Sequence, residues 1–82
     1  MAAKIKTIFD QRYRMLIKNL VKLRHERKLS QNKLAKMTGY HNNYIARIEL
    51  CERRLDIVEM IDYMRHLGMS DSDIIKAVKE IM

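Results

Sequence analysis

The stretch Gln31–Leu50, QNKLAKMTGYHNNYIARIEL, carries the spacing that decides the fold. Ala35 is a small residue on the apolar side of a short predicted helix, where a second helix must cross closely. Gly39 stands where the chain reverses, at a site that often needs a positive φ, which costs glycine little. Ile45 and Ile48 are three residues apart and give the second helix an inward-facing pair. The pattern predicts a helix-turn-helix over residues 31–50, built to place one helix in the major groove of DNA.

The chain before this unit is expected to form one long helix. Asp10 is the predicted N-cap, and the helix is expected to run to about Arg27. One stripe of this helix is apolar except for a single charge; its members are Tyr13, Leu16, Ile17, Leu20, Val21 and Arg24. Residues 1–9 are expected to form a basic arm, either loose or wound into an extra helical turn.

Helix-start signals define the elements that follow. Ser30 is expected to cap the second helix, about 31–37, and the third is expected over about 42–50. Asp56 followed by Glu59 begins a fourth helix that runs to about His66. The residues expected to point inward from the fourth helix are Val58, Ile61, Met64 and Leu67. Ser70 with Asp73 begins a fifth helix, from 71 to near the end. The sequence therefore predicts an all-α, compact five-helix bundle.

Charge is distributed unevenly along the 82 residues. Residues 1–54 hold fourteen Lys or Arg and four Asp or Glu, a net charge of +10, whereas residues 55–82 hold three and six, a net charge of −3. The basic part contains the predicted helix-turn-helix. This asymmetry fits one side that faces a polyanion and a separate structural or partner-facing end. A soluble basic protein with solvated charges is the alternative interpretation.

Several classes of protein are disfavoured by composition. Cys51 is the only cysteine, which excludes an internal disulfide and a cysteine-rich zinc site. The three histidines lack zinc-type spacing, and the two glycines form no phosphate-cradling loop. No apolar run approaches membrane-spanning length, and MAAKIKTIF lacks the apolar stretch of a secretory signal. We expect a cytoplasmic protein that is not an enzyme and needs no metal, cofactor or membrane.

The segment LRHERKLSQNKLAKMTGYHNNYIARIELCERRLDIVEMIDYMRHLG resembles the phage repressor/Cro-type helix-turn-helix domain, the XRE family of prokaryotic regulators. The similarity covers about residues 13–68 and is most specific in LSQNKLA, the glycine turn, YIARIE and ERRLD. Members of this family are five-helix bundles of the lambda-repressor-like type that bind operator DNA, generally as two-fold dimers. The resemblance thus implies a DNA-binding domain over residues 10–69, with 70–82 as a C-terminal helix of the same domain.

The resemblance also implies which residues read bases. Asn42, Asn43 and Arg47 match the positions of the recognition helix that face base edges. Tyr44 lies beside them and is expected to contact a thymine methyl or the sugar-phosphate backbone. Asn pairs bidentately with adenine and Arg with guanine in the major groove. The alternatives are that Asn42 or Asn43 only caps the helix and that Arg47 only makes a surface contact.

A second group is expected to contact phosphate. Gln31 matches a family position that touches backbone phosphate and sometimes a base, and Arg53 and Arg54 match backbone-contacting positions in the loop after the recognition helix. Ser30 joins this group because helix N-termini attract anions. Lys33 is unfavourable beside the positive end of its own helix, a cost that a nearby phosphate offsets. A solvated lysine is the alternative for Lys33.

Arg24 and Glu49 match a buried ion pair that ties the first helix to the third, which explains a charge on an apolar stripe. Two positions depart from the family pattern. Cys51 stands where glycine is usual, so the turn after the third helix is expected to be reshaped or strained. His41 stands where a Ser or Thr cap is common, which leaves the start of the third helix open.

The C-terminal helix is the predicted dimerisation element, because a domain this small does not cover all of its apolar residues. The predicted interface residues are Ile74, Ile75, Val78 and Ile81. The alternative is that this helix folds back and completes the monomer core. Both roles are compatible if they use opposite edges of one stripe.

Two functions remain open at this stage. The first is a sequence-specific transcriptional regulator, acting as a homodimer on a near-palindromic operator of double-stranded DNA: a phage-type repressor, a restriction–modification controller or an antitoxin. The second is an antitoxin-like or adaptor protein whose main role is to bind a partner protein such as a toxin, with DNA binding secondary. The acidic, apolar C-terminal end keeps this second interpretation in view.

Overall fold

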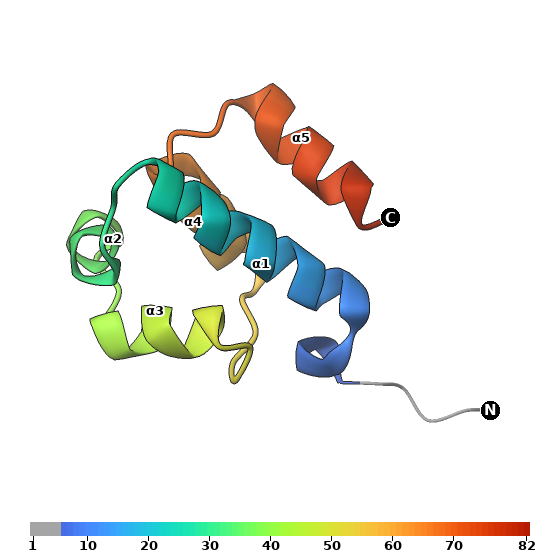
Figure 1. The fold of residues 1–82 in the computed structure, drawn as a ribbon, viewed down its shortest axis with the longest axis horizontal. Coiled ribbons are helices and arrows are strands. Elements are labelled where there is room, and N and C mark those ends of the chain that lie inside the picture. Colours follow the sequence, from blue (N-terminus) through green and yellow to red (C-terminus); the bar gives the residue numbers. More distant parts are fainter. Residues whose placement is uncertain (1–5) are drawn as a thin grey trace.

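The computed structural model describes residues 6–82 as five α-helices preceded by one 3-10 turn. The helices are α1 (Gln11–Glu26), α2 (Gln31–Thr38), α3 (Asn42–Glu49), α4 (Ile57–His66) and α5 (Asp71–Glu80). The turn η1 spans Thr7–Phe9; residues 1–5 of the predicted basic arm lie outside the described residues. No strand occurs within 6–82, which confirms the predicted all-α five-helix fold. In Figure 1, α1 crosses the centre, with α3 on one side of it and α5 on the other.

Each α-helix begins at a side-chain cap. Asp10 accepts from the backbone N–H of Arg12, and Ser30 accepts from that of Lys33 at 3.0 Å. Asp56 and Ser70 form reciprocal capping boxes with the third residue of α4 and α5. These bonds satisfy N–H groups that lack partners in the first turn. The predicted starts of α1, α2, α4 and α5 are therefore confirmed.

Helices α1, α3 and α4 end in turns with the same hydrogen-bond pattern. After α3, Cys51 N–H donates to Ile48 O and Glu52 N–H donates to Arg47 O, the pair of bonds that defines a Schellman turn. Such a turn needs one residue at positive φ. That residue is Lys28 after α1 (φ 56°), Cys51 after α3 (φ 56°) and Gly68 after α4 (φ 84°). Cys51 therefore adopts the conformation that glycine adopts at lower cost, as its departure from the family pattern suggested.

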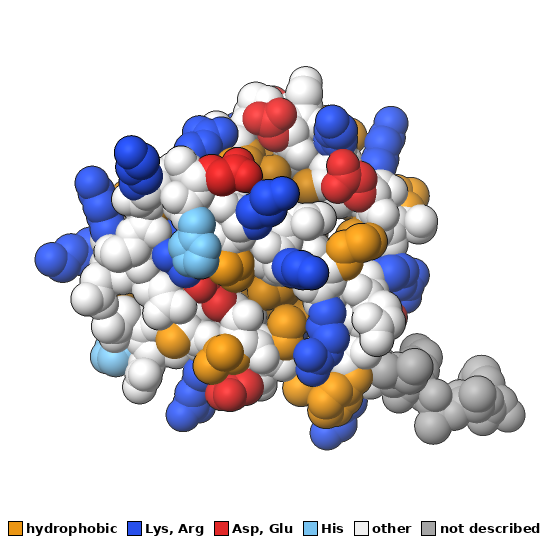
Figure 2. Space-filling view, in the orientation of Figure 1, with side chains coloured by type: hydrophobic (Ala, Val, Ile, Leu, Met, Phe, Trp, Pro, Cys, Tyr) orange, Lys and Arg blue, Asp and Glu red, His pale blue; other side chains and the backbone are white. Residues whose placement is uncertain are grey.

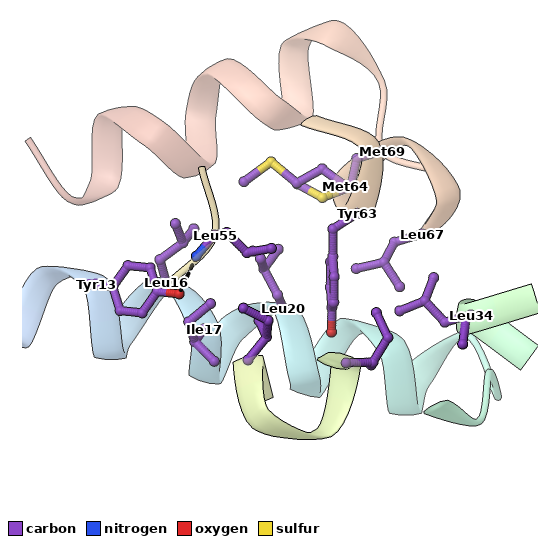
Figure 3. Packing of buried hydrophobic residues seen from close by; sticks show 13 residues of the cluster. Tyr13, Leu16, Ile17, Leu20, Leu34, Leu55, Tyr63, Met64, Leu67 and Met69 are labelled. Carbon is purple, nitrogen blue, oxygen red and sulfur yellow. Dashed lines mark hydrogen bonds between the residues drawn. The ribbon is translucent and has the colours of Figure 1, made fainter. Parts of the chain in front are cut away.

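One hydrophobic core joins the first four helices. Leu34, Ile45, Ile48 and Met64 are completely shielded from solvent, and the aromatic ring of Tyr63 stands among them. Figure 3 shows the Tyr63 ring extending from α4 across the core, with its hydroxyl pointing away from α5. The closely packed α2–α3 pair thus rests on α1 and α4, and its position relative to them is fixed by burial.

The predicted inward face of α4 was wrong for two residues. Val58 is 63% exposed and Ile61 is 39% exposed. The side chains that α4 turns to the core are Met60, Tyr63, Met64 and Leu67. This face is rotated from the expected one and brings the ring of Tyr63 into the core, where its hydroxyl donates to Glu49 at the end of α3. Val58 consequently faces solvent, and Ile61 lies at the margin of the core-facing side of α4.

Helix α5 packs less deeply than the others. None of its residues is buried; Ile74, Ala77 and Ile81 pack partly against the core. One groove runs between α5 and α1, lined at its base by Leu20 and Leu23, and a second is lined by Val78, Ile81 and Met82. In Figure 2, acidic side chains near the top, where α5 lies, are interspersed with lysine and arginine side chains, and further basic side chains lie around the edge of this face. Within residues 6–82, no helix has the length and apolar character needed to cross a membrane.

Candidate nucleic-acid interface

The two edges of α3 differ sharply in environment. Ile45 and Ile48 have 0% relative exposure and form the inner edge. Asn42, Asn43 and Arg47 are all exposed on the opposite side. Because the inner edge is fixed in the core, the three polar side chains are held outward along a helix of eight residues. This is the arrangement that insertion into a major groove requires.

The start of α3 is set by His41. Its Nδ1 accepts a hydrogen bond from the backbone N–H of Asn43 at 3.2 Å, so the imidazole serves as the N-cap. Neither asparagine is therefore needed as the cap. The Asn42 amide instead donates to Oδ1 of Asn32 on α2. Asn43 and Arg47 make no side-chain hydrogen bond with the described residues, so their polar groups remain available to a ligand.

A buried ion pair lies at the other end of α3. Nε of Arg24 donates to Glu49 Oε2 and Nη2 donates to Oε1, both at 2.7 Å, in a bidentate arrangement between α1 and α3. Nη1 of Arg24 donates to the carbonyl oxygen of Leu29 at 2.7 Å. The two side chains are 7% and 5% exposed. The structure thus pairs Arg24, the one charged residue of the apolar stripe of α1, with Glu49, the last residue of α3.

Two further side chains complete this cluster. The hydroxyl of Tyr63 donates to Glu49 Oε2, and Nε2 of Gln31 donates to Oε1 at 2.9 Å. Burial acts to raise the pKa of Glu49, but hydrogen bonds from Arg24, Tyr63 and Gln31 outweigh it and hold that pKa below its ordinary value. The same burial and the Glu49 carboxylate raise the pKa of Tyr63. The carboxylate is therefore ionised and bound by residues from α1, α2 and α4.

Sequence reasoning did not include Tyr63 in this cluster, and it assigned Gln31 to backbone phosphate and sometimes a base, not to a contact within the protein. One N–H of the Gln31 side-chain amide donates to Glu49 within the protein. The presence of Tyr63 on an otherwise aliphatic helix face was the available signal, because a buried tyrosine hydroxyl requires a partner. Ser30 and Lys33 are both exposed at the start of α2. The Ser30 hydroxyl caps Lys33 N–H, and the lysine ammonium makes no ion pair with the described residues.

Tyr44 lies in a cluster of aromatic and charged side chains. Its ring is half-buried and meets the edge of Tyr40 at a centroid distance of 5.7 Å and an interplanar angle of 73°. The Tyr40 hydroxyl donates to Oδ2 of Asp62 at 2.8 Å, and burial together with this carboxylate raises the pKa of Tyr40 to about 12. The guanidinium carbon of Arg53 lies 4.9 Å from the centroid of the Tyr44 ring. Tyr44 is thus packed between the turn before α3 and the loop after it.

The loop after α3 exposes both of its arginines. Arg53 and Arg54 lie between Cys51, whose positive φ turns the chain, and the cap of α4. The buried Tyr13 hydroxyl donates to Arg53 O at 3.2 Å and accepts from Leu55 N–H at 3.0 Å. The hydroxyl of Tyr13 therefore holds the loop backbone from the core side, and the charged side chains of the loop are exposed to solvent.

The comparisons with known proteins agree with this geometry. A helix-turn-helix family model matches residues 20–74, well over half of the chain and all of α2, α3 and α4. The chain belongs to the lambda repressor/Cro-type helix-turn-helix family. This confirms the resemblance noted in the sequence and the lambda-repressor-like type of the all-α fold. No curated protein sequence matches the chain.

As a helix-turn-helix protein of this type, the chain is a DNA-binding regulator. The exposed edge of α3 and helix α5 lie on opposite sides of α1 (Figure 1). The four residues predicted for a dimer interface are not equivalent in the structure. Ile75 is 56% exposed, Val78 is half-buried, and Ile74 and Ile81 pack partly against the core.

Proposed function

We propose that this helix-turn-helix protein is a sequence-specific transcriptional regulator that binds a near-palindromic operator as a homodimer. The observation that carries the proposal is the outward edge of α3. Asn42, Asn43 and Arg47 are exposed together there, while the opposite edge is immobilised by two fully buried isoleucines. A rigid helix with amide and guanidinium groups on one edge suits direct readout of bases.

Specificity would come from three side chains. Each bidentate pair of Asn with adenine or Arg with guanine is worth ~1–3 kcal/mol of discrimination. Ser30, Lys33, Arg53 and Arg54 would contact phosphate and set the register of the protein on the duplex. In this proposal the exposed N-terminal turn of α2 approaches one strand and the loop after α3 approaches the other. The second N–H of the Gln31 amide is able to join the phosphate contacts while the first stays on Glu49.

Dimerisation would use the surface of α5 that the monomer leaves uncovered. Ile75 is exposed, Val78 is not among the residues packed against the core, and the groove at Val78 continues to the exposed side chains of Ile57 and Met82. An apolar surface of this kind commonly marks a protein interface. A two-fold dimer would place its half-sites about one helical turn apart, ~34–36 Å, or at a multiple of that spacing.

Selection of bound sites from random duplex DNA tests the sequence-specific function. A shared motif with paired half-sites is the expected result. Arg47→Ala should then relax preference at one base position, whereas Arg53→Ala should weaken binding to all sequences similarly and reduce the salt slope. If both variants lower affinity uniformly, Arg47 is not a base reader; if no motif emerges, the sequence-specific function is wrong.

Light scattering after size exclusion tests the homodimer separately. A homodimer at the concentrations used for DNA binding supports the proposal, and Ile75→Asp should then shift it to monomer. A monomer at those concentrations instead favours the alternative of an antitoxin-like or adaptor protein, whose apolar C-terminal surface binds a different chain.

A further inference from the structure

Arg53 is held in place from two directions, through its side chain and through its backbone. Its guanidinium lies over the face of the Tyr44 ring at 4.9 Å. Its carbonyl oxygen accepts from the buried Tyr13 hydroxyl, which also accepts from the N–H of Leu55. An arginine whose guanidinium and backbone are both restrained loses less conformational freedom when it binds a ligand.

The Tyr44 ring is itself braced. It extends from α3 and meets the edge of Tyr40, whose hydroxyl donates to Asp62 of α4. The ring therefore has a second neighbour besides Arg53, and that neighbour is tied to α4. Tyr44 connects the recognition helix to the loop that follows it, and any shift of α3 moves the surface on which Arg53 rests.

Arg54 offers a comparison within the same loop. It is exposed like Arg53, but within the described residues its guanidinium makes no hydrogen bond, ion pair or aromatic contact. Two arginines of the same charge are thus adjacent, one supported by an aromatic ring and one without such support. Any difference in their contribution to DNA affinity reports on that support.

We propose that Tyr44 is a positioning residue that holds the Arg53 guanidinium for a DNA phosphate, and is not itself a reader of bases. A guanidinium that stacks on a ring through its face keeps the N–H donors of its edge free. Those donors form a planar fork that matches two phosphate oxygens. This inference rests on the proposed function, because the phosphate belongs to the DNA that α3 contacts.

The ring and not the hydroxyl of Tyr44 supplies this support. Burial and the neighbouring carboxylate of Glu59 raise the pKa of Tyr44, so its side chain is neutral at all pH values used for DNA binding. Tyr44→Phe therefore preserves both the ring and the charge. Tyr44→Leu keeps apolar volume against Tyr40 but removes the aromatic face under Arg53.

The test measures the dissociation constant for one selected duplex and one scrambled duplex over a range of salt concentrations. Tyr44→Phe should stay within about twofold of the wild type, and Tyr44→Leu should weaken both duplexes by roughly two- to fivefold. Arg53→Ala should weaken both and lower the salt slope by about one. In the Arg53→Ala background, Tyr44→Leu should have no additional effect, and Arg54→Ala should weaken binding less than Arg53→Ala.

Each of the following outcomes of the variant series overturns the inference. Tyr44→Leu that alters preference at a single base position makes Tyr44 a base reader. If the fold-changes in dissociation constant of Tyr44→Leu and Arg53→Ala multiply in the double variant, the two side chains act separately. Equal losses from Arg53→Ala and Arg54→Ala show that the stacked arginine has no advantage. Thermal melts of each variant establish that it is folded, and Tyr44→Ala is unsuitable because it leaves a space beside Tyr40.

The same titrations separate this inference from the proposed function. If the wild type binds duplexes without sequence preference, the sequence-specific function is wrong, but the salt titration still tests Tyr44 on the scrambled duplex. If a motif is selected and Tyr44→Leu changes nothing, only the positioning role is wrong. If the wild type binds no duplex, both are wrong.

Discussion

Helices α3 and α5 are similar in length but are attached to the protein in different ways. The eight residues of α3 include two isoleucines with no exposure and end in a carboxylate that three side chains bind. The ten residues of α5 include none that is buried, and open grooves flank the helix. Both helices have an amphipathic sequence, so periodicity alone does not distinguish them.

The difference teaches where rigidity is located in this fold. The base-reading role proposed for α3 requires a helix that is held in a precise position, and burial together with a satisfied polar cluster restrains α3 in this way. Helix α5 is defined mainly by its own capping box and by partly buried side chains. Its outer surface is left uncovered within the domain, which is why we propose it as the surface that a second chain covers.

The largest expected effect comes from removing the carboxylate at the end of α3. Glu49→Ala leaves the Arg24 guanidinium buried without its partner and should lower the free energy of unfolding by ~3–5 kcal/mol. Urea denaturation measures the change, and Glu52→Ala, at an exposed glutamate in the following loop, is the control. An unchanged midpoint for Glu49→Ala would show that the ion pair adds no stability to α3.

A matched pair of isoleucines compares the two helices directly. Ile48→Ala in α3 should cost ~2–5 kcal/mol because it opens a cavity in a closed core. Ile75→Ala in α5 should change stability by less than about 0.5 kcal/mol at concentrations where the chain is monomeric. Similar losses for the two variants would remove the distinction between an anchored α3 and a loosely attached α5.

A smaller effect is expected from titrating Glu49, since a neutral carboxyl still accepts hydrogen bonds from Arg24. Its pKa is lowered in the folded protein from the ordinary value of 4.5. The stabilisation that the ionised Glu49 carboxylate contributes is therefore fully present above pH 4.5, its ordinary pKa. It is lost as the pH falls through the lower pKa that Glu49 has in the folded protein. The free energy of unfolding, measured by chemical denaturation at a series of pH values from 6 downward, should decrease less steeply for Glu49→Gln than for the wild type. Equal slopes would mean that Glu49 does not contribute to the pH dependence.

The smallest change concerns the turns that follow α1 and α3. Lys28 and Cys51 both have φ 56°, where a side chain costs ~1–2 kcal/mol relative to glycine. Lys28→Gly should therefore raise stability by ~1 kcal/mol, reduced by the greater freedom of glycine in the unfolded chain. Cys51→Gly should gain less because the cysteine side chain packs partly on the core. Thermal melts of both variants test this order, and a loss of stability in Lys28→Gly would contradict it.

Local signals in the sequence were sufficient for most of the fold. Asp10, Ser30, Asp56 and Ser70 each cap a helix where the sequence indicated one, because capping is a contact between residues two or three apart. The turn at Gly39 has φ 79°, as its role required. The family resemblance identified Arg24 and Glu49, which stand in contact although 25 residues separate them.

Contacts between helices were harder to predict. Periodicity predicted an apolar face on α4 that included Val58 and Ile61, but both residues are exposed in the structure. The rotation of a helix about its axis depends on the elements that it packs against. Nothing in the local sequence shows that Tyr63 reaches Glu49, or that the Arg53 guanidinium stacks on Tyr44. Such pairs depend on the crossing of helices, which becomes visible only in three dimensions.

The meeting of four helices at one carboxylate has a consequence for folding kinetics. Glu49 is bound by Arg24 of α1, Gln31 of α2 and Tyr63 of α4, so it leaves water only when all four helices have assembled. We therefore expect the stabilisation from this cluster to arise late in folding, after the rate-limiting step. Contacts that form after that step act chiefly by slowing unfolding, so loss of the Glu49 cluster should raise the unfolding rate more than it lowers the folding rate.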